Sequence, residues 1–131
     1  MKVTTNWKTK HEFESKQGHN TIHLDGGGHN GFGPKALLLA GLAACSGIDV
    51  VDILGKMKVE FSDLEIDVET TQTEVYPKVF KDILITYKVK TSSKNEEKLK
   101  KAINLSLEKY CGVSAMLQKN SAINYKLEIT S

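Results

Sequence analysis

The pattern of apolar and polar positions changes several times along this chain. The N-terminal third alternates weakly, with Gly and Asn turns between the segments, which is typical of short strands at 3–7, 12–15 and 21–24. A glycine-rich loop over residues 25–33 follows. Pro34 suits the first position of a helix, and apolar residues continue from there to about Met57. This pattern predicts a helix apolar on nearly all sides, which belongs in the middle of a fold or in an oligomer core.

Alternation returns in the second half of the chain. Residues 58–68 and 79–89 predict two long antiparallel strands joined near Tyr76-Pro77. Residues 96–110 predict an amphipathic helix covered with lysines, and 111–117 a second short helical turn. A last strand is expected over 123–129. The order strands, helix, strands, helix, strand predicts an α+β fold with a mostly antiparallel sheet.

Composition narrows the class of protein. A length of 131 residues and a hydrophobic content of 40% fit one soluble globular domain over residues 1–131. The net charge of +2 is too small to favour nucleic acid or an acidic membrane as partner. No stretch resembles a signal peptide, and the longest apolar run is well short of the roughly 20 residues of a membrane span. We therefore expect a cytoplasmic protein with reduced thiols.

Cys45 and Cys111 are the candidate chemical groups. Asp49 lies four residues after Cys45 and would share its helix face, and carboxylates disfavour a thiolate unless a cation offsets them. Cys111 follows Lys109 and opens a helical stretch, and both features favour a thiolate. For each cysteine taken alone, a packed thiol acting as a small hydrophobe remains the alternative.

The two cysteines taken together indicate a more specific chemistry than either one alone. They are too far apart in sequence for a Cys-x-x-Cys motif, so they meet only if the two helical segments pack together. A disulfide would then require their Cα atoms to lie within about 7 Å. A reactive thiol with a resolving thiol is the usual arrangement for peroxide reduction through a sulfenic acid.

Two other patterns in the chain allow different interpretations. Gly26-x-Gly28-x-x-Gly31 matches the dinucleotide-binding pattern, with Asp49 and Asp52 downstream, but no second βα unit follows. The histidines would act together only in a metal site, and solvated surface histidines are the more ordinary interpretation: His11, His19, His23 and His29. We expect no cofactor and no metal.

The cysteine segments resemble a known family. Residues 33–51, GPKALLLAGLAACSGIDVV, resemble the central helix of the OsmC/Ohr family, the osmotically inducible and organic hydroperoxide resistance proteins. Residues 108–117, EKYCGVSAML, resemble its second cysteine segment, and residues 76–80, YPKVF, the strand entry between them. The Cys-x-x-x-Asp-Val-Val form of residues 45–51 looks most like the YhfA-like branch.

The resemblance implies a fold and an activity. It implies an intertwined homodimer with buried central helices and active sites at the dimer interface. It also implies thiol-dependent reduction of organic hydroperoxides in oxidative-stress defence. The resemblance further implies that Cys45 attacks the peroxide and that Cys111 resolves the resulting sulfenic acid as a disulfide. An external dithiol reductant would then reduce the disulfide to the two thiols.

The chain departs from the family peroxidases at the groups that activate the thiol. Those enzymes use an arginine and a glutamate, whereas this chain has no arginine and carries Lys35 and Ala36 in the corresponding stretch. Lys35 is the candidate replacement charge, without the bidentate geometry of a guanidinium, and Asp49 is the candidate to orient it. The alternative function is therefore a weakly catalytic or inactive protein that binds a small apolar or electrophilic ligand in the same cleft.

Overall fold

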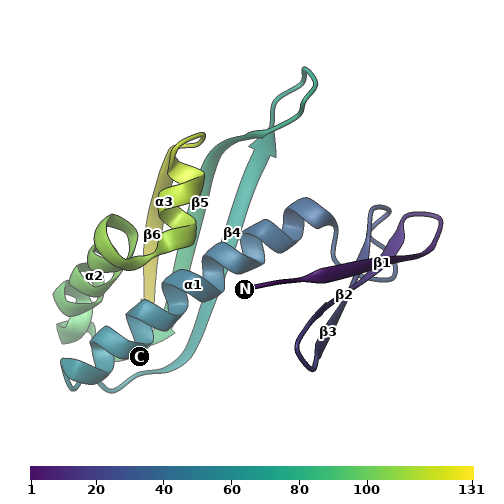
Figure 1. The fold of residues 1–131 in the computed structure, drawn as a ribbon. Helices are drawn as coiled ribbons and strands as arrows, with labels where there is room; N and C mark the ends of the chain where they lie inside the picture. Colours follow the sequence, from purple (N-terminus) through teal and green to yellow (C-terminus); the bar gives the residue numbers. More distant parts are fainter. The chain divides into compact units, whose positions relative to one another are not determined.

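The computed structural model describes residues 1–131, which form two compact units, Met1–Leu39 and Ala40–Ser131. The sequence predicts one domain, and that remains a prediction. Each unit is described by itself below. The α-helices and strands of both are labelled in Figure 1.

The first unit is a three-stranded antiparallel meander. Its strands β1 (Thr4–Thr9), β2 (Glu12–Gln17) and β3 (Asn20–Asp25) lie in the order β1-β2-β3. The register pairs Trp7 with Phe13 and Phe13 with Leu24, so these apolar side chains share one face of the sheet. Trp7, Phe13 and the neighbouring Ile22 are all exposed. The meander therefore presents an uncovered apolar face.

Helix α1 (Pro34–Lys56) follows, and its start at Pro34 confirms the sequence prediction. The fixed φ of proline suits the first turn, where its missing N–H costs no hydrogen bond. The helix continues unbroken through residues 48–54. By length and composition it is the one helix that could cross a membrane, a test that the core helix of a soluble protein also passes.

The second unit contains a mixed three-stranded sheet in the order β4-β5-β6, made of β4 (Ser62–Gln72), β5 (Phe80–Lys90) and β6 (Ile123–Thr130). Strand β4 is antiparallel to β5 and β6 is parallel to it. A parallel neighbour needs a crossover connection, and here the crossover is helical. It consists of η1 (Ser93–Asn95), α2 (Glu96–Leu105), η2 (Ser106–Tyr110) and α3 (Gly112–Gln118).

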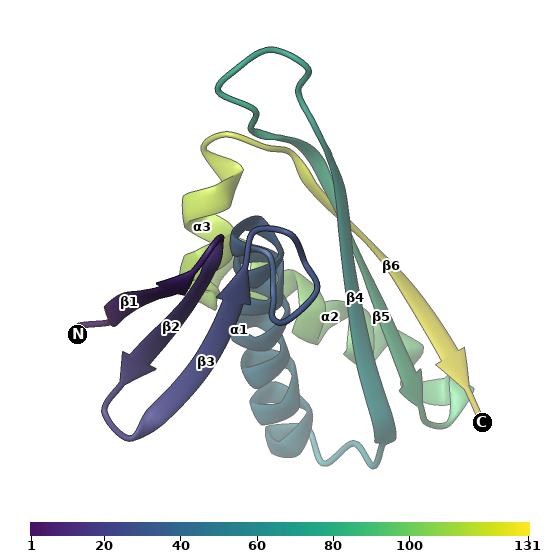
Figure 2. The ribbon, with the colours of Figure 1, turned by 90° about the vertical axis from the view of Figure 1, so that its right-hand side faces the viewer.

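The helices of the second unit lie on one face of its sheet (Figure 2). The core between them is apolar and fully buried, formed by α1, β5 and α2: Leu42, Val50, Leu54, Ile83, Ile85, Tyr87, Leu99, Ala102 and Ile103. Gly47 permits close packing of α1 on the sheet, because a Cβ there would lie 3.0 Å from Cδ1 of Ile66. The opposite face carries charged pairs, with Lys88 Nζ 2.9 Å from Asp67.

Two boundaries differ from the sequence prediction. Strand β4 begins at Ser62, so the alternating residues before it belong to the connection from α1. The helix expected over 96–110 is an α-helix only to Leu105, and then widens into the π-helical turn η2. Apolar periodicity does not distinguish these two helix types. This wider turn directly precedes Cys111.

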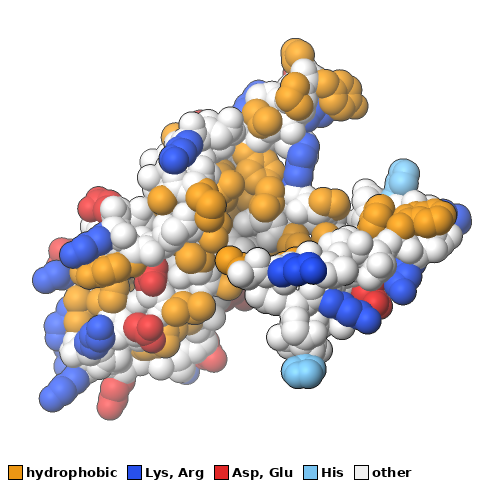
Figure 3. Space-filling view, in the orientation of Figure 1, with side chains coloured by type: hydrophobic (Ala, Val, Ile, Leu, Met, Phe, Trp, Pro, Cys, Tyr) orange, Lys and Arg blue, Asp and Glu red, His pale blue; other side chains and the backbone are white.

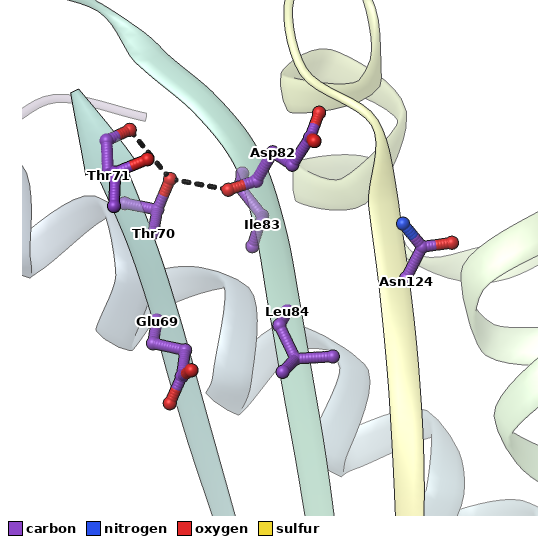
Figure 4. A pocket seen from close by; sticks show the side chains of 7 residues that line it. All are labelled: Glu69, Thr70, Thr71, Asp82, Ile83, Leu84 and Asn124. Carbon is purple, nitrogen blue, oxygen red and sulfur yellow. Dashed lines mark hydrogen bonds between the residues drawn. The ribbon is translucent and has the colours of Figure 1, made fainter. Parts of the chain in front are cut away.

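The far end of the β4–β5 hairpin is irregular. The register shifts between Thr70 and Gln72, and there the Thr70 hydroxyl donates to the carbonyl of Asp82 across the pair at 2.7 Å. Figure 4 shows this contact on the sheet surface. Beyond it, the connecting loop carries exposed Val75 and Tyr76, with Lys78 Nζ 5.0 Å from the Tyr76 ring centroid. Hydrophobic side chains gather at this tip in Figure 3.

The sequence predicts that α1 is apolar on nearly all sides and belongs in the middle of a fold or in an oligomer core. Within the chain only one side is buried, through Leu42, Val50 and Leu54, while Ile48 and Val51 are exposed. Contiguous exposed apolar residues are typical of interaction surfaces.

Candidate functional site

Three buried hydroxyl groups from α1, β5 and η2 converge in the second unit. Ser46 Oγ lies 2.6 Å from the Tyr87 hydroxyl, and Ser106 Oγ lies 2.9 Å from Ser46 Oγ. Ser106 Oγ also lies 2.9 Å from Oδ2 of Asp49. The Ser46, Ser106 and Tyr87 residues are fully buried. We call this group, together with Asp49, the hydroxyl chain.

The hydroxyl chain ends at the carboxylate of Asp49. Ser106 Oγ has donor geometry toward both Oδ2 of Asp49 and Oγ of Ser46, and in the Ser46–Tyr87 pair either hydroxyl is able to donate. Burial raises the pKa of Tyr87 to about 12 despite the opposing Ser46 hydrogen bond, so Tyr87 stays protonated.

Both cysteines lie beside the hydroxyl chain. Cys45 directly precedes Ser46 on α1 and is half-buried. The backbone N–H of Cys111 donates to the carbonyl oxygen of Ser106 at 2.7 Å, and the Cys111 Sγ accepts from the N–H of Ser114 at 3.3 Å. Ser106 therefore contacts Asp49 through its hydroxyl and Cys111 through its carbonyl.

The thiols interact with each other as well. Burial raises the pKa of Cys111 to about 11, against the opposing Ser114 hydrogen bond, and a hydrogen-bonding contact with Cys45 raises it further. The negative charge of Asp49 acts in the same direction. The two cysteine segments therefore do pack together, which is the condition for the two thiols to meet. Both thiols are free and do not lie at disulfide distance.

The π-helical turn η2 positions Cys111 and Ser106. The Cys111 N–H bonds to the carbonyl five residues back, which widens the last turn before α3 begins. Single π-turns are often found at functional sites, where they redirect side chains out of the regular helical path. Here the turn ends the amphipathic helix and places the Cys111 side chain as the cap of α3.

A cleft of about 480 Å³ opens beside Asp49. Its walls come from α1 and from the α2–η2 segment, with apolar, acidic and basic side chains: Asp49, Asp52, Ile53, Lys56, Lys101, Leu105 and Tyr110. The carboxylate of Asp49 therefore borders both the buried hydroxyl chain and a space that a small molecule can enter. That combination is usual for a reactive site.

The other sequence candidates lie elsewhere. Lys35 is in the first turn of α1, within the first unit, and its role as an activating charge remains a prediction. No group of three or more His, Cys, Asp or Glu side chains is arranged to bind a metal ion.

The dinucleotide interpretation of the glycine loop is wrong. Residues 48–54 belong to α1 and form no second strand. The Asp25 carboxylate accepts the backbone N–H groups of Gly27, Asn30 and His29, which lower its pKa. These N–H groups are the ones a phosphate would need, and a carboxylate already occupies them. Gly31 is required for packing, since a Cβ there would lie 2.6 Å from the carbonyl oxygen of His23.

Sequence reasoning identified the thiols and Asp49 but missed their supporting hydroxyls. Ser46 could have been predicted from the sequence, because a serine in a strongly apolar helix is expected to be buried and then needs a hydrogen-bond partner. Tyr87 had a weaker signal, because its hydroxyl sits on the inward face of a predicted strand. No sequence feature indicated Ser106, since the pattern around it predicts a regular amphipathic helix.

The burial of Cys111 predicts unequal thiol reactivity. At pH 8 we expect Cys111 to react with iodoacetamide roughly 100-fold more slowly than a free cysteine, because its pKa of about 11 leaves little thiolate. Peptide mass spectrometry of a time course measures this rate for each cysteine. Alkylation of Cys111 at the rate of free cysteine would contradict the packing described here.

The chain is similar to known proteins over most of its length. The family model described as OsmC-like protein matches residues 26–126. Protein YhfA of Escherichia coli K12 is 30% identical over 118 residues, covering 90% of this chain and 88% of that protein.

Solved structures share the fold. A hypothetical protein from Aquifex aeolicus VF5 has a TM-score of 0.87 and 30% identity, covering 98% of this chain and 95% of that one. The organic hydroperoxide resistance protein OhrB of Bacillus subtilis has a TM-score of 0.64 and 25% identity, covering 98% and 96%. With a family model that spans most of its length and both cysteine segments, this chain belongs to the OsmC-like protein family.

Proposed function

We propose that the protein reduces organic hydroperoxides with its two thiols, Cys45 as the attacking residue and Cys111 as the resolving residue. The observation that carries the proposal is the contact between the two thiols next to Ser106 and Asp49, of which Asp49 borders an open cleft. A buried thiol with a raised pKa is a poor first nucleophile, so Cys111 suits the second step.

Family membership indicates a peroxide-related or redox-related function. One structural relative is named an organic hydroperoxide resistance protein. YhfA carries no activity in its name. The specific reaction is therefore proposed from this chain's own thiols, with the relatives as support.

The chemistry proceeds in balanced steps. The Cys45 sulfur attacks the terminal oxygen of the hydroperoxide, an S–O bond forms, the O–O bond breaks, and an alcohol leaves. Cys45 is then a sulfenic acid. The Cys111 sulfur attacks it, water leaves, and a disulfide forms. An external dithiol reduces the disulfide and restores both thiols. The second step requires the η2 segment to move, because the thiols start beyond disulfide distance.

We also propose that the functional form is a homodimer. An apolar groove of about 650 Å³ lies between α1 and β4 in the second unit, lined largely by small and branched side chains: Ala40, Ala43, Ala44, Gly47, Ile48, Val51, Leu64 and Ile66. Small residues let a second helix approach closely, and a second copy of α1 offers the complementary apolar surface.

A second candidate function follows from the missing arginine. Without a guanidinium near the thiols, the same fold would bind a small apolar or electrophilic ligand with little turnover.

One experiment tests the proposed reaction. Reduced protein is treated with one equivalent of cumene hydroperoxide, and intact mass and free thiols are followed over seconds to minutes. The expected result is stoichiometric formation of cumyl alcohol with loss of two hydrogens and both free thiols. Unchanged mass and thiol content would reject the peroxidase and favour the ligand-binding candidate.

A further inference from the structure

We propose that Asp49 takes the proton from the Cys45 thiol as the sulfur attacks and gives it to the departing alcohol oxygen. The inference rests on the proposed hydroperoxide reduction and assigns the proton transfer within it. In this mechanism the Asp49 carboxylate takes the place of the positively charged arginine that activates the thiol in the family peroxidases.

The position of Asp49 on α1 is the first argument. Residues four apart on a helix share a face, with Cβ atoms about 5–6 Å apart, so Asp49 lies over the same stripe as Cys45. One carboxylate oxygen, Oδ2, is bound by Ser106. The Ser106 hydrogen bond fixes the position of this oxygen, and the same carboxylate borders the cleft.

The hydroxyl chain is the second argument. Ser106, Ser46 and Tyr87 are buried and connected by hydrogen bonds of 2.6–2.9 Å. The Ser106 hydroxyl is a donor to Asp49, and a hydrogen bond donated to a carboxylate is a strong, orienting contact. Ser46 follows Cys45 directly, and Ser106 binds the Cys111 backbone. The chain therefore fixes the carboxylate relative to both thiols.

Access is the third argument. Asp49 borders the 480 Å³ cleft, so a hydroperoxide entering there meets the carboxylate. The charged and titratable groups that face Asp49 come from every packed element: Cys45, Asp52 and Lys56 of α1, Lys101 of α2, Tyr110 of η2, Cys111, and Tyr87 of β5.

The proton accounting explains how the reaction proceeds without an arginine. An arginine stabilises a thiolate formed in advance. With Asp49, the S–H proton moves to the carboxylate as the S–O bond forms, and the O–O electron pair leaves on the alcohol oxygen. The same proton then moves from Asp49 to that oxygen. The net change is thiol plus hydroperoxide to sulfenic acid plus alcohol, and no unpaired charge is created.

The test compares Asp49→Asn with Asp82→Asn, the same change at an exposed position of β5 outside the cleft. At pH 6 we expect Asp49→Asn to consume cumene hydroperoxide about 100-fold more slowly than wild type, within the usual range for loss of acid–base catalysis. The rate of this variant should rise about tenfold per pH unit, because only preformed thiolate reacts. The wild-type and Asp82→Asn rates should stay flat from pH 6 to 8, so the difference from Asp49→Asn disappears at alkaline pH.

A second measurement separates proton transfer from simple damage. Cys45 alkylation by iodoacetamide needs only the thiolate, and removing a neighbouring negative charge favours that form. Compared with wild type, Cys45 of the Asp49→Asn variant should therefore be alkylated faster, while the variant reduces hydroperoxide more slowly. Asp49→Glu, which keeps the carboxylate, should retain the flat pH profile, so the test stands even if the asparagine variant folds poorly.

The outcomes distinguish the two proposals. If wild type and Asp49→Asn consume hydroperoxide at equal rates at pH 6–7, the role of Asp49 is overturned and the proposed function stands. If wild type consumes none, the proposed function fails and this inference fails with it. Slower alkylation together with slower peroxide reduction in Asp49→Asn would assign Asp49 a purely structural role and overturn the proton transfer.

Discussion

Replacing Cys45 by serine is expected to lower the rate of hydroperoxide reduction by roughly 10³-fold or more, because the hydroxyl group is a very weak nucleophile at neutral pH. The substitution is nearly isosteric and the side chain is half-buried, so the fold should survive. Loss of cumene hydroperoxide, followed by a xylenol orange assay under excess dithiol, measures the rate. Thermal melting of the variant confirms that the loss is chemical.

Cys111→Ser is the matched control, since it removes the other thiol of the chain. It should consume one equivalent of hydroperoxide and then accumulate a sulfenic acid on Cys45, which dimedone traps and mass spectrometry locates. Cys45→Ser should give no trapped product. If Cys45→Ser keeps the wild-type rate, or if dimedone labels Cys111 in wild type, the assignment of the two thiols is reversed or rejected.

Much of the fold was predictable from the sequence because its elements have strong periodic signals. The start of α1 at Pro34 follows from the rigid proline ring, and the strands over Phe80–Lys90 and Ile123–Thr130 alternate over their full length. The parallel pairing of β5 with β6 was not predicted. Period-two alternation identifies a strand but carries no information on the direction of its neighbour.

The site was only partly predictable, for a related reason. Cys45 and Asp49 share one helix, and their spacing fixes a common face. Ser106 and Tyr87 reach the same place from distant segments, through a π-turn and through the inward side of β5. A buried hydroxyl has no periodic signature, and its partner is defined only when the helices pack on the sheet.

The exposed apolar side of α1 is one reason for proposing a homodimer. Ile48 and Val51 are exposed on a helix whose other side is fully packed, and the meander of the first unit also exposes Trp7. Apolar area left in water costs about 25 cal/mol per Å² relative to burial. A second copy that covers these surfaces would recover that free energy, which is why we propose the homodimer.

The decisive prediction for this dimer is Ile48→Asp. Ile48 is 63% exposed in the chain and lines the apolar groove, so an aspartate there should leave the fold of the chain intact. In a dimer that buries this position, an unpaired carboxylate costs several kcal/mol, enough to weaken association by roughly 10³-fold. Light scattering during gel filtration, with analytical ultracentrifugation over a concentration series, measures the change from dimer to monomer.

Met116→Asp is the matched control because Met116 is also an exposed apolar helix residue, at 65%, but lies on α3 outside the groove. It should remain dimeric with an unchanged dissociation constant. A wild-type protein that stays monomeric at all concentrations would reject the homodimer, and dimeric Ile48→Asp would move the interface away from the groove. Since Ile48 lies between Cys45 and Asp49 on α1, loss of hydroperoxide reduction in monomeric Ile48→Asp would further indicate that the reactive site is completed by the second copy.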